Sequence, residues 1–148
     1  MSSWSVSTEL TSKEEDIVFR WISQDSYWAN GIPRAVFERS LANSLCFALR
    51  DRDQTLRGFA RTVTDSATFA YLADVFIDPS ERGKGAGHFL LEAIVNHPKL
   101  QNLRRWLLAT KDAHALYARY GFEALPDPSV IMARNDPDIY ARLGTDAT

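Results

Sequence analysis

The stretch Asp74–Leu91, which reads DVFIDPSERGKGAGHFLL, combines an apolar strand, a basic glycine-rich turn and the start of a helix. The strand ends at Asp78-Pro79, because proline has no backbone N–H with which to continue a ladder. Three glycines then occupy alternate positions over 83–87, and the basic residues Arg82 and Lys84 lie among them. The first turn of a helix carries unpaired N–H groups and the positive end of its dipole. The stretch therefore predicts a site for an anion, with phosphate as the favoured one.

Two common phosphate-binding motifs do not fit this turn. A nucleotide-hydrolase loop needs lysine followed by serine or threonine after its last glycine, but here Gly87 is followed by His88. The dinucleotide fingerprint needs its third glycine three residues after the second, and the spacing here is two. The alternative is an ordinary glycine turn between a strand and a helix, with no bound anion.

The composition sets limits on the function. The chain has 148 residues, 45% of them apolar, so a single domain with a sizeable core is expected over residues 1–148. A net charge of −2 argues against nucleic acid or an anionic membrane as the partner. Cys46 is the one cysteine, which excludes an internal disulfide and, with no signal-peptide pattern, favours the cytoplasm. No apolar run is long enough to span a membrane.

The rest of the chain predicts alternating helices and strands. Thr11 or Ser12 can cap a first helix that ends near Ser23, and Pro33 suits the first turn of a second helix that runs to about Ala42. The expected strands are a short one in Met1–Thr8, Ser44–Arg50, Leu56–Thr64, Thr68–Ile77, Leu103–Thr110 and a last one at Val130–Ala133. The helix after the glycine turn stops before Pro98, and a further short helix over Asp112–Tyr120 ends at Gly121. A strand, a helix and a strand in one compact unit imply two parallel neighbours joined by a right-handed crossover.

A second motif lies downstream, in Leu116–Phe122, which reads LYARYGF. Alone it is an amphipathic helix with a glycine stop. Together with Arg82–Gly87, however, it resembles the GNAT superfamily of acyl-CoA-dependent N-acetyltransferases. That family has a pyrophosphate motif of Gln or Arg, two residues, Gly, one residue, then Gly or Ala, and a leucine-tyrosine, three residues, glycine-phenylalanine signature. Both motifs are matched, in the family's order, and the resemblance covers nearly the whole chain.

The resemblance implies a fold and a cofactor site. The fold would be α/β, in three layers, with a mixed twisted sheet of about six or seven strands flanked by about four helices. The co-substrate would be acetyl-CoA, and no metal is expected. The residues implied to bind acetyl-CoA are Val75, Phe76, Ile77, Arg82, Gly83, Lys84, Gly85, Ala86, Gly87 and Thr110. Thr110 stands where relatives often carry asparagine, so one amide contact to the cofactor is in question.

The resemblance also assigns catalytic roles. Tyr117 would protonate the departing CoA thiolate as general acid, which suits a phenol with an ordinary pKa of about 10. The backbone of the strand Val75–Ile77 would hold the acetyl carbonyl and stabilise the oxyanion that forms during transfer. Polyamine-acetylating relatives carry a Glu-Asp pair where this chain has Ala73-Asp74, so Asp74 is the candidate to bind the amine or accept its proton. Tyr71 and His114 are weaker candidates for the base.

The acceptor is predicted to be a primary amine of a small molecule or a peptide. Tyr27, Trp28 and Phe37, with Tyr71, are the predicted acceptor-binding residues, because aromatic faces attract ammonium groups. Cys46 has no activating partner in the sequence, which favours direct transfer over a covalent enzyme intermediate. The alternative function is a non-catalytic acyl-CoA-binding or regulatory domain on the same fold. The sequence leaves a monomer and a homodimer both open.

Overall fold

Antiparallel strands joined by short polar turns form the centre of the computed structural model, which describes residues 4–146. One five-stranded sheet has its strands in chain order, from β1 to β5. The first four strands pair antiparallel, and β5 pairs parallel to β4. The strands are β1 (Ser5–Ser7), β2 (Leu45–Arg50), β3 (Leu56–Thr64), β4 (Phe69–Ile77) and β5 (Arg105–Leu108).

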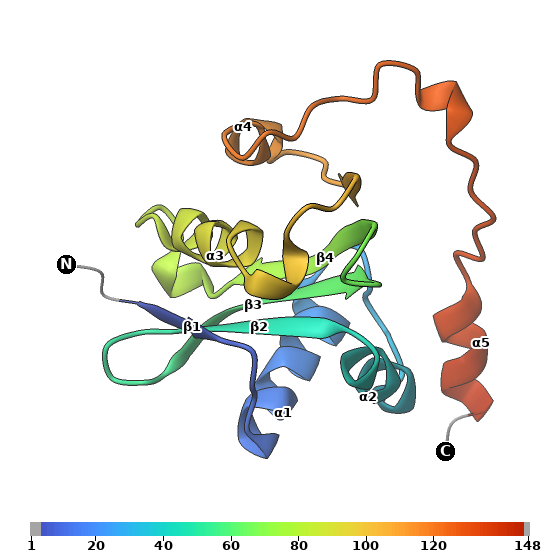
Figure 1. The fold of residues 1–148 in the computed structure, drawn as a ribbon. Helices are drawn as coiled ribbons and strands as arrows, with labels where there is room; N and C mark the ends of the chain where they lie inside the picture. Colours follow the sequence, from blue (N-terminus) through green and yellow to red (C-terminus); the bar gives the residue numbers. More distant parts are fainter. Residues whose placement is uncertain (1–3, 147–148) are drawn as a thin grey trace.

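Helices cover both faces of this sheet, as Figure 1 shows. One face packs against α3 in a core with Phe47, Leu49 and Leu72. The other face packs against the N-terminal helices in a second core that contains Phe59 and Phe76. The helices are α1 (Ser12–Arg20), a π-helical turn (Trp21–Asp25), α2 (Arg34–Ala42), α3 (Ala86–Val95), α4 (His114–Ala118) and α5 (Ile139–Asp146). Single 3₁₀ turns occupy Pro79–Glu81, Pro98–Leu100 and Pro128–Val130.

Local sequence signals account for the helix boundaries. Thr11 caps α1 in a capping box with Glu14, since each side chain accepts a hydrogen bond from the other residue's backbone N–H. Pro33 is the N-cap of α2, and α3 ends at Val95, before Pro98. The first helix continues through its π-helical turn to Asp25, two residues beyond the predicted end.

The predicted fold class is confirmed, although the sheet has fewer strands than predicted. Part of the predicted first strand forms as Ser5–Ser7, and residues 1–3 lie outside the described part of the chain. The predicted strand at Val130–Ala133 is wrong, because Val130 closes a 3₁₀ turn and no strand follows it within the described residues. A strand needs a neighbour to pair with, and this segment lies apart from the sheet (Figure 1). Among residues 4–146, no helix combines the length and the apolar character that crossing a membrane requires.

Candidate functional site

The centre of β4 is distorted, and the distortion opens the sheet. The pairing of β3 with β4 shifts register between Phe59 and Arg61, so that one β3 residue faces both Asp74 and Val75. Asp74 has a φ of 54°, in the left-handed region that residues other than glycine rarely adopt. Pairing between β4 and β5 ends at Leu72. Beyond that residue the edge of β4 that faces β5 has no strand partner among residues 4–146, so its backbone groups are available to another molecule.

Asp74 is held by two side chains that are distant in sequence. Its Oδ2 accepts a hydrogen bond from Arg61 Nε at 2.8 Å, and its Oδ1 accepts one from Trp28 Nε1 at 2.7 Å. Arg61 also donates to Ser44 Oγ at 3.1 Å. The Asp74 side chain is only 12% exposed, so the ion pair with Arg61 offsets the cost of burying its charge. Each carboxylate oxygen keeps a further lone pair that can accept another hydrogen bond.

The loop between α1 and α2 reaches across to the segment after β5. Tyr27 and Trp28 pack edge to face with ring centroids 5.0 Å apart, and both are exposed. Lys111 places its Nζ 4.4 Å from the centroid of the Tyr27 ring, and its backbone N–H donates to the Tyr27 hydroxyl at 3.4 Å. Two aromatic rings, a carboxylate and an ammonium group therefore meet beside the unpaired part of β4. The sequence pattern did not indicate Arg61 or Lys111, because each lies far along the chain from its partner.

The other two predicted acceptor residues differ in position. Tyr71 lies on β4 and is 37% exposed, so its ring is accessible. Phe37 is 1% exposed and packs against Phe19 inside the core. A buried ring cannot belong to an exposed acceptor wall, and this corrects the prediction for Phe37. The apolar spacing of α2 turns that face toward the sheet.

Tyr117 lies in α4, near Tyr27. It is 8% exposed and belongs to the core on the α3 side, where its ring packs against Phe122 with centroids 6.0 Å apart. Burial raises the pKa of Tyr117, and the nearby Tyr27 and Asp112 raise it further. The phenol is therefore fully protonated at neutral pH and can act as a proton donor.

The turn before α3 has the backbone that an anion site requires. Gly83 and Gly85 have φ values of 78° and 89°, and a Cβ on either would meet no atom within 4 Å. Gly85 is the N-cap of α3, which leaves the first N–H groups of that helix without partners inside it. Arg82 donates from Nε to the carbonyl of Ile77 at 2.9 Å, which joins the turn to the end of β4. The glycine turn and the unpaired end of β4 are therefore adjacent.

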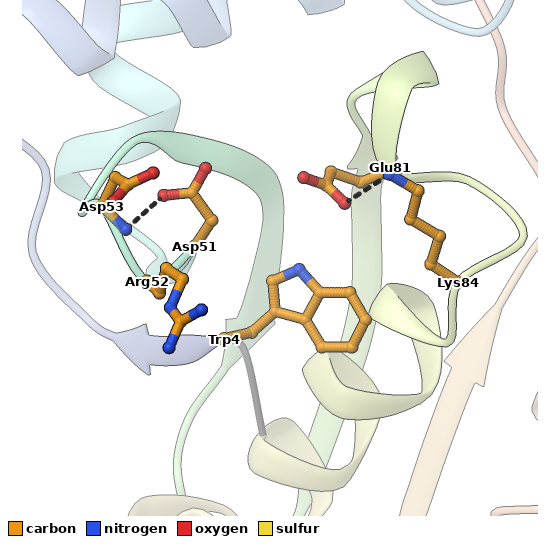
Figure 2. A pocket seen from close by; sticks show the side chains of 6 residues that line it. All are labelled: Trp4, Asp51, Arg52, Asp53, Glu81 and Lys84. Carbon is orange, nitrogen blue, oxygen red and sulfur yellow. Dashed lines mark hydrogen bonds and ion pairs between the residues drawn. The ribbon is translucent and has the colours of Figure 1, made fainter. Parts of the chain in front are cut away.

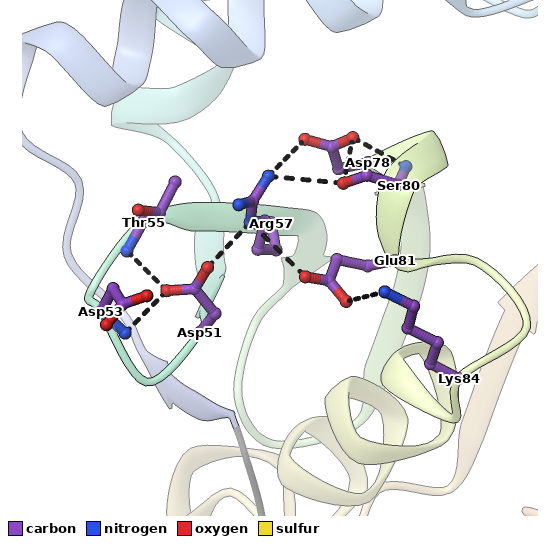
Figure 3. Close-up of polar contacts among 8 residues, drawn as sticks. All are labelled: Asp51, Asp53, Thr55, Arg57, Asp78, Ser80, Glu81 and Lys84. Carbon is purple, nitrogen blue, oxygen red and sulfur yellow. Dashed lines mark hydrogen bonds and ion pairs between the residues drawn. The ribbon is translucent and has the colours of Figure 1, made fainter.

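Arg57 lies between Asp51 and the residues just before the turn, as Figure 3 shows. Its Nε donates to Asp51 at 2.9 Å and lies 3.5 Å from Glu81, while one terminal nitrogen donates to Asp78 at 3.4 Å. Glu81 in turn lies 3.6 Å from the ammonium group of Lys84. The network balances the acidic residues just before the glycine turn, so that they oppose an incoming anion less strongly.

A depression of about 410 Å³ lies beside the same turn (Figure 2). Its lining residues are Trp4, Asp51, Arg52, Asp53, Glu81 and Lys84. Three of these side chains are carboxylates and two are basic, so the lining suits no single ligand charge. None of the residues around Asp74 or Tyr117 lines it, and we assign the depression no part in the chemistry.

The remaining predicted residues have local roles in the structure. Thr110 Oγ1 accepts a hydrogen bond from the backbone N–H of Ala113 at 3.2 Å, just before α4. Its hydroxyl can still donate a proton to another group. Phe76 stacks on Trp21 with centroids 5.1 Å apart, so that only its backbone is open to a ligand. His114, a weaker candidate for the base, is exposed at the start of α4.

Comparison with known proteins gives a consistent result. The sequence profile described as the acetyltransferase (GNAT) family matches residues 10–122. A protein of Gibberella zeae assigned as an acetyltransferase is 31% identical over 136 residues, which cover 77% of this chain and 75% of that protein. The crystal structure of a protein from Xanthomonas campestris, assigned as an acetyltransferase of the GNAT family, is 45% identical with a TM-score of 0.89 and covers 95% of this chain and 99% of that one. Glucosamine-6-phosphate N-acetyltransferase from Arabidopsis thaliana shares the fold, with a TM-score of 0.64 at 13% identity over 90% of this chain and 99% of that one.

Proposed function

Because this chain belongs to the acetyltransferase (GNAT) family, we propose that it transfers an acetyl group from acetyl-CoA directly to a primary amine, with Tyr117 as the general acid. One observation carries the proposal. Tyr117, which is buried and protonated, packs in one core with Val75 and Ile77 of β4 and with the start of α3, directly after the glycine turn. An anion site, a polar backbone edge and a proton donor are the three parts that the reaction needs.

The residues present suit acetyl-CoA. The pyrophosphate would meet the free N–H groups at the start of α3, where Gly83 and Gly85 leave open space around the backbone. The pantetheine amides would pair with the unpaired edge of Val75–Ile77, as a further strand would. Acetyl-CoA supplies the activated acetyl group, and the chain holds it at these two places.

Tyr117 supplies the proton that the reaction consumes at sulfur. As the amine forms its bond to the acetyl carbon, the carbon–sulfur bond breaks and the thiolate accepts the phenolic proton. Burial keeps that proton in place at neutral pH, since it raises the pKa of Tyr117. Backbone N–H groups at the distorted part of β4 would stabilise the negative charge on the carbonyl oxygen.

The acceptor site is proposed beside Asp74. The carboxylate, which Arg61 and Trp28 hold in place, can accept a hydrogen bond from the ammonium group of the acceptor. The faces of Tyr27 and Trp28 would attract the same cation. Deprotonation of the amine would then use Asp74, directly or through water.

Direct transfer is favoured over a covalent enzyme intermediate. Burial raises the pKa of the Cys46 thiol to about 12, so it carries almost no thiolate at neutral pH. Its thiol donates weakly to the backbone carbonyls of Leu41 and Ser44, and it packs against the core on the α1 side. The lone cysteine also supports a reducing, cytoplasmic setting as part of the proposal.

Replacing Tyr117 by phenylalanine tests the general acid. Tyr117→Phe should lower turnover by roughly 10² to 10⁴, the usual contribution of general acid catalysis, and leave the Kd for acetyl-CoA unchanged. Tyr120→Phe is the matched control, because Tyr120 is nearby but its hydroxyl is hydrogen bonded to His88. The measurements are CoA release over a panel of amines and calorimetric binding of CoA.

The outcomes separate the two candidate functions. Unchanged turnover in Tyr117→Phe would remove this residue from its role. Binding of CoA by the unaltered protein, with no turnover on any amine, would favour the non-catalytic acyl-CoA-binding domain instead.

A further inference from the structure

Lys111 is a cation in the candidate acceptor site that the proposed reaction does not use. It follows β5 in the chain, and its side chain is exposed. Its Nζ lies over the ring of Tyr27, 4.4 Å from the centroid, and its backbone N–H donates to the Tyr27 hydroxyl at 3.4 Å. Among residues 4–146, no carboxylate forms an ion pair with this ammonium group. An aromatic ring therefore positions Lys111, while its charge stays unneutralised.

A series of contacts connects Lys111 to Asp74. The rings of Tyr27 and Trp28 pack edge to face with centroids 5.0 Å apart. Trp28 Nε1 then donates to Asp74 Oδ1 at 2.7 Å. The ammonium group of Lys111 and the carboxylate of Asp74 thus lie at the two ends of one pair of aromatic rings. Both rings are exposed, Tyr27 by 54% and Trp28 by 42%, so a ligand can lie along them.

The charges of this site are unbalanced before an acceptor enters. Asp74 carries one negative charge, which Arg61 already pairs at 2.8 Å, and Lys111 adds a second positive charge. The Asp112 carboxylate adds to the effect of burial in raising the pKa of Tyr117, and within the described part of the chain it forms no ion pair with Lys111. An acceptor with ammonium groups alone would bring further positive charge beside Lys111, and like charges repel.

An anionic group on the acceptor would remove this imbalance. The lysine ammonium is a compact charge with three rotatable donors on a flexible stem, which suits a carboxylate or a phosphate. Hydrogen bonds between two charged groups are about twice as strong as those between neutral groups. The site therefore has a place for each charge of a molecule that carries both.

We propose that the acceptor is a small amine that also carries an anionic group, a carboxylate or a phosphate. Its ammonium group binds Asp74, its anionic group binds Lys111, and the atoms between them lie along Trp28 and Tyr27. The inference rests on the proposed function, because it takes Asp74 as the site of the acceptor amine. It narrows the acceptor class to zwitterions and disfavours amines that carry only positive charge.

Matched pairs of acceptors test the proposal on the full chain at saturating acetyl-CoA. Amino acids with the amine at the far end of the chain, in order of increasing length, are each compared with the alkylamine of the same length. At the length that fits the site, the KM of the amino acid should be about tenfold lower than that of the alkylamine. Phosphoethanolamine against ethanolamine is the phosphate arm, and the larger of the two preferences identifies the anionic group.

Substitutions of Lys111 locate the source of the preference. Lys111→Met removes the charge at similar length, so the preference for the zwitterion should fall from about tenfold to near one. Lys111→Arg keeps the charge and should keep most of the preference. Lys99→Met is the matched control, because Lys99 is also exposed but lies in the 3₁₀ turn Pro98–Leu100, outside the candidate site. This control should keep the full preference.

Calorimetry supplies a readout that needs no turnover. The preferred zwitterion is titrated into the protein saturated with CoA, which has no acetyl group to transfer, and Lys111→Met should weaken its binding about tenfold. Turnover of alkylamines as readily as zwitterions, or a preference that survives Lys111→Met, would overturn the inference and leave acetyl transfer standing. Zwitterion binding that depends on Lys111, with no turnover of any amine, would instead overturn acetyl transfer and leave the binding site standing. Neither binding nor turnover would overturn both.

Discussion

Gly85 and Gly87 are two residues apart but differ in what they require of the backbone. Gly85 has a φ of 89°, whereas Gly87 lies inside α3 with no positive φ. A Cβ on Gly85 would meet no atom within 4 Å, and a Cβ on Gly87 would make an ordinary contact with Leu116 at 3.7 Å. Neither substitution to alanine causes a clash, so the difference between them is conformational.

The magnitude follows from this difference. Alanine in the left-handed region costs about 1–2 kcal/mol, and for a chain of this size each kcal/mol lowers Tm by about 2–4 °C. Gly85→Ala should therefore lower Tm by roughly 2–8 °C. Gly87→Ala should leave Tm unchanged or raise it, because alanine is more stable than glycine inside a helix by about 0.5–1 kcal/mol.

Binding should separate the two variants as well. If the N–H groups of this turn hold the pyrophosphate, the shifted backbone of Gly85→Ala should weaken CoA binding by about tenfold or more, whereas Gly87→Ala should bind almost normally. Thermal unfolding with and without CoA, together with calorimetry, measures both effects. Equal Tm values would refute the conformational argument, and normal CoA binding by a destabilised Gly85→Ala would refute the assignment of the turn.

Three further predictions concern other parts of the molecule. The hydrogen-bonded ion pair with Arg50 lowers the pKa of Glu14 from 4.5 to about 2, so the stability that this pair contributes is present above pH 4.5 and is lost as the pH falls toward 2. Glu14→Gln should be less stable than the unaltered protein at pH 7 and should lack this pH dependence, as measured by urea unfolding at several pH values. Trp28→Ala should raise the KM for the amine about tenfold with little change in the KM for acetyl-CoA, because the ring holds Asp74 and is proposed to face the acceptor; equal shifts in both constants would contradict this role. Cys46→Ala should keep full turnover, and alkylating reagents should not inactivate the unaltered enzyme at neutral pH; loss of turnover in the variant would instead support a covalent route.

Much of the fold follows from signals that act over a few residues. The capping box at Thr11, the prolines before α2 and after α3, and the polar turns between strands each act on the local backbone. They place the helices and the three central strands to within a few residues. The strand predicted at Val130–Ala133 shows the limit of such signals, since a strand also requires a neighbour that the local sequence does not specify.

The candidate site divides in the same way. The sequence alone determined the family, the glycine turn and the tyrosine of the second motif, because each is a short pattern whose chemistry lies in its own residues. Only the tertiary structure decided that Trp28 and Arg61 hold Asp74 and that Lys111 meets Tyr27. Trp28 and Asp74 are 46 residues apart, and their contact exists because the α1–α2 loop crosses to the distorted part of β4. Such contacts depend on how the two faces of the sheet are packed, which no local pattern encodes.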